Sequence, residues 1–281
     1  MHNPFVPETH EGWSLLHLMY RLDWSGLLQT DRRDREQMAV EACGALCGTV
    51  ADPSDGATTL VQLLGHKGDL MVIAFRRSFD ELGRTQLAWS RTRLHAYLQL
   101  TSSYVSIVEL GMYEMTAKLH RQLAAQGLVH DTDAYNDAFA AEMDKQRERV
   151  SSRLFSSIPL ARHVCFYPMN KRRGEIANWY TEPFERRAEM MLEHGKVGRE
   201  YAGKVTQIIS GSIGFDDWEW GVDLFADDPV IFKKLIYEMR FDEASAKFAE
   251  FGPFYVGLQF STGELARLLE GELPQLREQQ S

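Results

Sequence analysis

The densest group of residues that could do chemistry lies between positions 167 and 180. It begins with Tyr167-Pro168-Met169-Asn170-Lys171-Arg172-Arg173 and continues with Asn178-Trp179-Tyr180. Pro168 has no backbone N–H to donate to a neighbouring strand, so we expect a strand to fray there and to leave Tyr167 at a sheet edge. Three consecutive basic residues would form a local positive site. A solvated turn beside a core tyrosine explains the same spacing, and the residues alone leave both interpretations open.

His194 differs from the other histidines, most of which have polar neighbours. It follows Met191 by three residues on a predicted helix whose apolar face includes Phe184 and Ala188, and Gly195 beside it leaves room for a flat partner. A neutral imidazole on such a face suits the axial ligand of a haem iron, with a glutamate or a carbonyl on its second nitrogen. A core histidine satisfied by a hydrogen bond is the plainer alternative.

Signature motifs of several other chemistries are absent from the sequence. It contains no His-Glu-x-x-His, Cys-x-x-Cys, Walker loop or Gly-x-Gly-x-x-Gly, so zinc hydrolysis and ordinary nucleotide binding lack support. Cys43 and Cys47 stand four apart on a predicted helix with no histidine nearby. This spacing permits a metal pair, but we interpret both as buried small apolar residues. With Cys165 they make three cysteines, an odd number that favours a reducing compartment over a disulfide framework.

The composition indicates a folded, acidic protein. The 281 residues correspond to roughly two domains, and 31 Lys and Arg against 40 Asp and Glu give a net charge of −9. This charge disfavours binding to nucleic acid or to an anionic membrane surface. The longest apolar run, Leu70 to Phe75, is far shorter than the roughly 20 residues of a membrane span. The first four residues do not resemble a secretion signal, so we predict a cytoplasmic protein.

The first half has the periodicity of a β-α-β-β-α-β unit. The predicted elements are a strand over 13–20, a helix over 31–48, a hairpin of strands 59–64 and 70–75, a helix capped by Ser78 and Glu81 that runs to about 98, and a strand over 105–110. After a helical connector the order repeats, with a strand over 161–169, a helix from Thr181 with Pro183 in its first turn, strands over 207–212 and 218–225, a helix capped by Asp228, and a strand over 254–260.

This repeat predicts an α+β protein of two tandem ferredoxin-like units. The expected organisation is an N-terminal unit over 1–111, a helical connector over 112–160, a C-terminal unit over 161–261, and a polar tail over 262–281 with a peripheral helix and a frayed end. Each unit covers one sheet face with helices, so the other face must be buried elsewhere. Two sheets facing each other, with a cavity between them, would satisfy that need.

Several ordered motifs resemble the coproheme decarboxylases of the chlorite dismutase superfamily. They are the two segments between 167 and 180, His194-Gly195 with Gly198-Arg199 and Tyr201-Ala202-Gly203-Lys204, Gly211-Ser212-Ile213-Gly214-Phe215-Asp216-Asp217 with Glu219-Trp220-Gly221, and Glu238-Met239-Arg240-Phe241-Asp242-Glu243-Ala244-Ser245. The resemblance is dense from Arg162 to Gly257 and looser in the first half, at Gly12-Trp13 and Val108-Glu109-Leu110.

The resemblance implies a dimeric α+β barrel of tandem ferredoxin-like units, usually as a ring of five subunits. It implies an enzyme that binds iron coproporphyrin III, removes two propionate carboxyls with hydrogen peroxide and yields haem b, after supply of the porphyrin by a ferrochelatase. His194 resembles the axial iron ligand, and Tyr167 the tyrosine that becomes a radical, with Lys171 beside it as a catalytic group. The residues that resemble the substrate-holding groups are Tyr167, Pro168, Met169, Asn170, Lys171, Arg153, Gln207 and Ser245, of which Arg153 and Ser245 have the weaker match.

Two alternatives remain at this stage. Chlorite dismutase itself, a haem b enzyme, places an arginine on the distal side to hold the oxyanion, whereas this sequence has Gln207 at the corresponding strand. A neutral amide cannot balance the charge of an anion, which argues against chlorite as substrate. A haem carrier or sensor without turnover is the second alternative, and conversion of coproheme by the purified protein would separate it from an enzyme.

Overall fold

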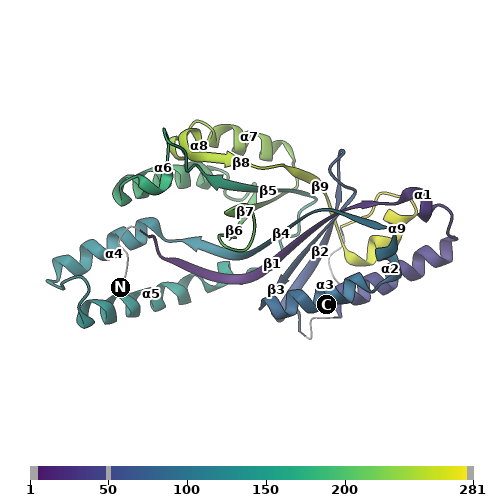
Figure 1. Ribbon diagram of the computed structural model, residues 1–281, viewed down its shortest axis with the longest axis horizontal. Helices are drawn as coiled ribbons and strands as arrows, with labels where there is room; N and C mark the ends of the chain where they lie inside the picture. Colours follow the sequence, from purple (N-terminus) through teal and green to yellow (C-terminus); the bar gives the residue numbers. More distant parts are fainter. Residues whose placement is uncertain (1–5, 49–51, 277–281) are drawn as a thin grey trace.

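Strands from both halves of the chain pair into one antiparallel sheet. The computed structural model describes residues 6–48 and 52–276, and within these ranges nine strands follow the order β7-β6-β4-β1-β3-β2-β9-β5-β8 (Figure 1). Because β5 pairs with β7 as well as with β9, the sheet closes into a barrel. The strands are β1 (Thr9–Leu22), β2 (Gly56–Leu63), β3 (Leu70–Arg76), β4 (Leu98–Gly111), β5 (His163–Lys171), β6 (Thr206–Gly211), β7 (Trp220–Ala226), β8 (Ala249–Phe251) and β9 (Tyr255–Phe260).

The helices complete two copies of one element order. They are α1 (Trp24–Leu27), α2 (Arg32–Cys47), α3 (Phe79–Ser90), α4 (Tyr113–Ala125), α5 (Asp133–Leu154), α6 (Phe184–Glu200), α7 (Val230–Met239), α8 (Glu243–Phe248) and α9 (Leu265–Leu269). The orders β1-α2-β2-β3-α3-β4 and β5-α6-β6-β7-α7-β9 confirm the predicted α+β fold of tandem ferredoxin-like units. Helices α6, α7 and α8 lie together beside the second-half strands, and α4 and α5 connect the halves (Figure 1).

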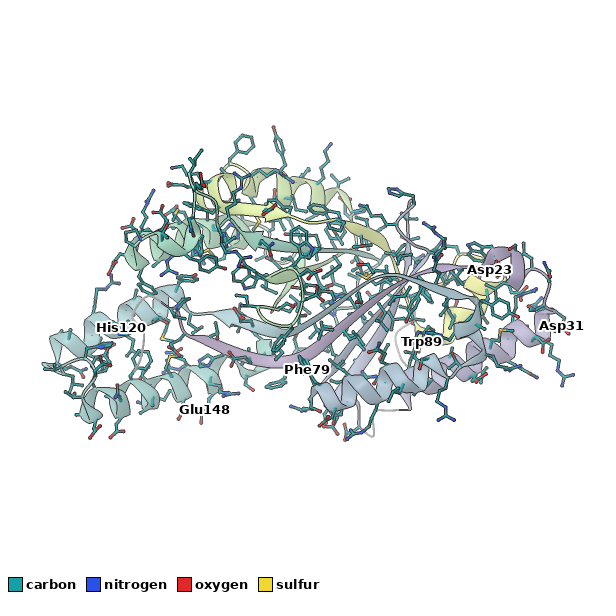
Figure 2. The ribbon with its side chains drawn as sticks, viewed as in Figure 1. Asp23, Asp31, Phe79, Trp89, His120 and Glu148 are labelled. Atoms are coloured by element: carbon teal, nitrogen blue, oxygen red, sulfur yellow. The ribbon has the colours of Figure 1, made fainter. Side chains whose placement is uncertain are left out.

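Local signals place α2 as predicted but not the end of α3. Asp31 caps α2 by accepting a hydrogen bond from the N–H of Asp34 at 2.7 Å (Figure 2). The predicted helix to residue 98 is wrong, because α3 ends at Ser90 and β4 begins at Leu98. The first half of β4 is largely exposed and lacks clear apolar alternation, so only its pairing along β1 reveals it as a strand.

The barrel interior is filled by side chains from both halves. A buried cluster includes Leu15, Met19, Ile73, Phe75, Phe166 and Phe225. The expectation of a cavity between two facing sheets is therefore wrong, because large aliphatic and aromatic side chains of the closed sheet occupy that space. Any sizeable ligand must bind outside the barrel, where helices cover the strands.

The polar tail contributes more to the core than expected. Leu265, Leu268 and Leu269 of α9 are buried in the cluster that also contains residues of α2 and β2. The tail composition is polar overall, and a single turn of leucines was too short to give a periodic signal. The predicted frayed end at residues 277–281 lies outside the described residues.

The cysteines are free thiols in different environments. Cys165 is buried and Cys43 is half-buried, whereas Cys47 is exposed at the last position of α2, so its interpretation as a buried residue is wrong. Over residues 6–48 and 52–276, no group of three or more His, Cys, Asp or Glu side chains is arranged for a metal ion. Within the same ranges, none of the helices has the length and apolar character needed to cross a bilayer.

Candidate functional site

Strand β5 directs its side chains alternately into the barrel and toward helices α6 and α7. Phe166 belongs to the interior cluster, whereas Tyr167 belongs to the cluster under these helices, with Met169 packed at its border. By the same alternation Lys171 shares the face of Tyr167 and Asn170 lies on the opposite face. Of the five consecutive residues predicted to hold the substrate, only Tyr167, Met169 and Lys171 present side chains to the helix-covered side.

Pro168 does not interrupt β5, contrary to the expectation from its sequence. The strand pairs with β7 throughout, with Pro168 opposite Gly221. On its other side, β5 pairs with β9 before Pro168 and with β8 after it. Pro168 thus occupies the gap between two partners, where no ladder N–H is needed, and its carbonyl accepts a hydrogen bond from Gly252 at 2.8 Å. Tyr167 therefore lies within the sheet and not at its edge.

The ring of Tyr167 is held among aromatic side chains. It stacks on Phe254 with 4.6 Å between ring centroids and lies 5.8 Å from Phe251. Burial, with a smaller contribution from Cys165, raises the pKa of Tyr167 above its ordinary value, while the charge of Arg240 opposes the rise. In the part of the chain that the structure describes, its hydroxyl has no hydrogen-bond partner. The phenol is therefore neutral at physiological pH, with its O–H hydrogen not engaged by the protein.

Lys171 is an unusual cation because its side chain is almost wholly buried, at 8% exposure. Its Nζ lies 4.5 Å from the ring centroid of Trp179 and donates to the carbonyl of Ala244 at 3.4 Å. Burial lowers the pKa of Lys171 to about 8, although the charges of Asp242 and Glu219 act in the opposite direction. The ammonium is thus poised to titrate just above neutral pH.

His194 lies on α6 with its side chain half-buried. Its Nδ1 is 3.0 Å from Oδ2 of Asp242, and within the described residues its Nε2 has no protein partner. A carboxylate on Nδ1 favours the tautomer that leaves the Nε2 lone pair free, as in histidines that bind metals. At Gly195 an added Cβ would meet only Arg199, at 3.3 Å, so α6 has room for a flat ligand beside His194.

The first turn of α8 connects His194 with Lys171. Asp242 caps α8 by accepting hydrogen bonds from the backbone N–H and the hydroxyl of Ser245, at 2.9 and 3.1 Å. Burial raises the pKa of Asp242, but the hydrogen bonds from His194 and Ser245 outweigh it and hold this pKa below its ordinary value. Ala244 of the same turn accepts from Lys171. The charged Asp242 therefore orients the imidazole and faces the lysine from one short segment.

Gln207 shares the sheet face of Tyr167. In the ladder, Gln207 of β6 pairs with Leu224 of β7, and Leu224 pairs with Cys165, two residues before Tyr167. Gln207 is half-buried, and Ile209 two residues further along the same face is 39% exposed. The outer face of β6 is thus less covered than those of β5 and β7, and a planar ligand beside α6 would find open sheet surface here.

The basic residues of the sequence prediction do not gather at one point. Lys171 is buried, whereas Arg172 and Arg173 are exposed, and Arg173 lies 3.7 Å from the carboxylate of Glu219. Arg153 is exposed in the last turn of α5 and makes no hydrogen bond or ion pair within residues 6–48 and 52–276. The structure does not bring Arg153 into contact with Tyr167 or Lys171, so its role as a substrate-holding residue stays a prediction.

Sequence reasoning missed two acidic residues whose carboxylates pair with histidines. Asp242 is one, and its position as a helix cap three residues before Ser245 was the available signal. The other is Asp223, which lies 3.0 Å from Nε2 of His17 inside the barrel, both side chains being wholly buried. No periodic signal could pair these two residues, because they are 206 positions apart and meet only when the sheet closes.

Fold and site together define a duplicated ferredoxin-like barrel whose second unit carries a carboxylate-supported histidine on a helix over the sheet. The family model described as chlorite dismutase matches residues 35–260. The chain is 41% identical to the coproheme decarboxylase of Staphylococcus saprophyticus over 261 residues, which cover 90% of this chain and 94% of that protein. The chain belongs to the chlorite dismutase family.

Further comparisons match relatives of different lengths. A protein of Natronomonas pharaonis named as haem-binding is 44% identical over 95% of this chain but only 42% of its own length, so the chain spans about half of this relative. The solved structure of a haem-binding protein from Thermus thermophilus has a TM-score of 0.80 at 38% identity and covers 96% of this chain and all of that one. A chlorite dismutase of Candidatus Nitrospira defluvii, with a TM-score of 0.69 at 16% identity over 92% of this chain and 96% of its own, shares the fold alone.

Proposed function

We propose that the protein is a coproheme decarboxylase, which converts iron coproporphyrin III to haem b with hydrogen peroxide. The observation that carries the proposal is the first turn of α8, where Asp242 supports His194 and Ala244 accepts from Lys171. This arrangement connects an imidazole whose Nε2 has no protein partner in the described residues to a buried cation on the sheet face that also holds Tyr167. The similarity to the Staphylococcus enzyme over nearly its full length supports the same conclusion.

The residues present fit an iron porphyrin substrate. His194 would bind the iron through Nε2, and its hydrogen bond to Asp242 would make the imidazole a stronger donor. Gly195 leaves the space that a macrocycle beside α6 requires. The substrate carries four propionates, which charge-assisted hydrogen bonds from Lys171 and Arg153 would bind. Met169 and Gln207 would contact the macrocycle from the sheet, and Ser245 would act by fixing Asp242.

Tyr167 would carry out the hydrogen-atom transfer between the oxidant and the propionate. When bound, the iron porphyrin supplies the oxidising power of peroxide, and the neutral phenol gives up its hydrogen atom to it. The resulting tyrosyl radical takes a hydrogen atom from the β-carbon of a propionate. A second electron passes to the oxidant as the bond to the carboxyl breaks, so CO2 leaves and a vinyl group remains. Each propionate thus loses CO2, one proton and two electrons, and one peroxide is reduced to two waters.

Lys171 would hold the reacting carboxylate beside Tyr167. Lys171 follows Tyr167 by four positions on the same face of β5, so Met169 is the one residue of that face between them. The face of Trp179 lies against the ammonium and limits its contact with water. Because hydrogen bonds between a charged donor and a charged acceptor strengthen when water is excluded, this environment suits anchoring of a propionate.

We also propose a cytoplasmic homo-oligomer, with five subunits as the family resemblance implies. The free thiols of Cys43, Cys47 and Cys165 suit a reducing compartment. Because the substrate already contains iron, another enzyme must insert the iron beforehand, and we propose a ferrochelatase as a transient partner. The net charge of −9 argues against nucleic acid as a partner.

Binding of the substrate is expected to weaken as the pH rises through about 8. The pKa of Lys171 is lowered to about 8, so its ammonium is present below that pH and is lost above it. The dissociation constant for iron coproporphyrin III should therefore increase above pH 8, as measured by absorption titration. Replacing Lys171 by glutamine should remove this pH dependence and weaken binding about tenfold at pH 7. Lys145→Gln on the exposed face of α5 is the control, and an equal pH dependence in Lys171→Gln would contradict the assignment.

Gln207 is expected to shape the distal side without being essential. Replacement by alanine removes the amide from the open face of β6 and should change the affinity of the iron porphyrin complex for cyanide or azide by about 2- to 12-fold, the effect of one hydrogen bond. Decarboxylation should remain measurable. Cyanide titration followed by absorption spectroscopy tests this, and unchanged affinity would place Gln207 away from the iron.

A chlorite assay distinguishes the proposed decarboxylase from a chlorite dismutase. Wild-type protein loaded with haem b is expected to evolve no dioxygen from chlorite at an oxygen electrode, because the amide of Gln207 does not balance an oxyanion. The same preparation loaded with iron coproporphyrin III should release CO2 after addition of peroxide. Rapid dioxygen release would show that the chain is a chlorite dismutase instead.

A further inference from the structure

The last two residues of β5 are held differently from the rest of the strand. The ladder between β5 and β7 ends with Met169 opposite Trp220, the first residue of β7. Glu219 directly precedes β7 and is buried, at 7% exposure. Beyond Met169, hydrogen bonds that involve side chains replace those of the ladder on this side of β5. Lys171, the last residue of the strand, is held in this way.

Two hydrogen bonds of opposite direction join Glu219 to the end of β5. The backbone N–H of Lys171 donates to Oε2 of Glu219 at 2.9 Å, and the backbone N–H of Glu219 donates to Oδ1 of Asn170 at 2.7 Å. The carbonyl of Glu219 accepts from the N–H of Ser212, directly after β6, at 2.8 Å. Asn170 and Glu219, which we call the β5 clamp, therefore fix the end of β5 to the loop between β6 and β7.

The side chain of Asn170 is used within the protein. It lies on the face of β5 opposite to Tyr167, and its amide oxygen accepts from Glu219. It is thus directed away from the sheet face under α6 and α7. Its effect on a ligand at that face would pass through the residues that it holds.

The surroundings of the Lys171 ammonium depend on where the Lys171 backbone lies. On the side away from the clamp, Lys171 pairs with Ala249 of β8. The chain then returns, because the N–H of Trp179 donates to the carbonyl of Arg172 at 2.9 Å, and the Trp179 ring lies 4.5 Å from Nζ of Lys171. A buried N–H without an acceptor costs free energy. Loss of the Glu219 carboxylate should therefore let the end of β5 move, and the ammonium with it.

We propose that Asn170 and Glu219 are positioning residues for Lys171, which hold its backbone so that its ammonium meets a propionate of the substrate. This role rests on the proposed function, because Lys171 is the residue that would anchor the propionate. Glu219 acts on the N–H of Lys171, and Asn170 acts on Glu219, so neither side chain needs to touch the substrate. Removal of either should loosen the Lys171 backbone and, as a consequence, weaken substrate binding.

Amide hydrogen exchange at Lys171 in the porphyrin-free protein tests the clamp by itself. The signal is resolved by NMR of protein that contains ¹⁵N-labelled lysine and is assigned by its absence in Lys171→Gln. Exchange should become at least about tenfold faster in Glu219→Ala and about threefold faster in Asn170→Ala. Glu219→Gln keeps a side-chain oxygen as acceptor and should stay within about twofold of the wild type. Glu250→Ala is the matched control, because this exposed glutamate lies opposite Asn170 on β8.

A double-mutant cycle shows whether the clamp acts through the lysine. Glu219→Ala should weaken binding of iron coproporphyrin III about 3- to 10-fold in the wild-type chain, as measured by absorption titration. In the Lys171→Gln chain the same change should weaken binding by less than about 1.5-fold. A side chain that only stabilised the fold would weaken binding by the same factor in both backgrounds.

Far-ultraviolet circular dichroism confirms folding, and Asn170→Ala is used for both measurements if Glu219→Ala does not fold. Exchange at Lys171 as slow in the alanine variants as in the wild type would overturn the clamp. Equal factors in the two backgrounds would overturn its action through Lys171. If Lys171→Gln alone bound iron coproporphyrin III as tightly as the wild type, the proposed role of the lysine would be wrong, and the positioning role with it. The exchange rates would still show whether the clamp holds the backbone.

Discussion

Tyr167→Phe is expected to bind iron coproporphyrin III nearly as tightly as the wild type and to convert almost none of it. Phenylalanine keeps the ring stacked on Phe254 and removes only the hydroxyl, which has no hydrogen-bond partner within the described residues. Stability should change by less than about 1 kcal/mol, because no satisfied hydrogen bond is lost. Turnover should fall at least about 100-fold, since the side chain no longer holds a hydrogen atom that it can release.

The matched control is Tyr255→Phe. Tyr255 is also a buried tyrosine of the second unit, but it lies in the interior cluster on the other side of the sheet. Its replacement should leave turnover near the wild-type rate. Rates are measured as haem b formed per minute by chromatography of the pigment. A Tyr167→Phe rate close to wild type would move the radical to another side chain, whereas equal losses in both variants would indicate a packing effect.

His194→Ala is expected to weaken binding of iron coproporphyrin III at least tenfold, or about 1.4 kcal/mol. Nε2 of His194 has no protein partner in residues 6–48 and 52–276, so the loss reflects the missing bond to iron more than a loss of packing. The ferric absorption spectrum should also shift, and imidazole added to the solution should partly restore it.

An exposed histidine supplies the control for this second variant. His66→Ala changes a histidine in the loop between β2 and β3 and should leave the spectrum and the affinity unchanged. An unchanged ferric spectrum in His194→Ala would exclude His194 as the axial ligand. Restoration by imidazole would also show that the variant keeps its folded site, because a collapsed site would not bind the added ligand.

The sequence predicted most of the fold because its elements carry local signals. The helix predicted over 31–48, the cap at Ser78 and the alternating strands of the second half agree with the structure. Pro168 misled the interpretation of β5, because its tolerance depends on a change of partner strand that no local pattern encodes. The closed barrel filled by side chains also depends on pairing between β5 and β7, whose paired residues are more than fifty positions apart in the sequence.

The candidate site was predictable only in part, for a similar reason. Motifs identify His194, Tyr167 and Lys171, but the link between them depends on Asp242 and the turn of α8, which approach from a distant segment. The burial that lowers the pKa of Lys171 arises from contact with Trp179 and the α8 turn, and neither is visible from spacing. Arg153 is exposed and makes no hydrogen bond or ion pair in the described chain that would fix its role.

The most direct test of the account is the fate of the porphyrin in the purified wild-type protein. Iron coproporphyrin III is bound and hydrogen peroxide is added stepwise. The pigments are then separated by chromatography and identified by their molecular masses with mass spectrometry. The account predicts a three-propionate intermediate followed by haem b, with about two peroxides consumed per haem, and bleaching without these products in Tyr167→Phe. Bound porphyrin that keeps all four propionates in the wild type, or is only bleached, would contradict it and leave a binding protein in place of an enzyme.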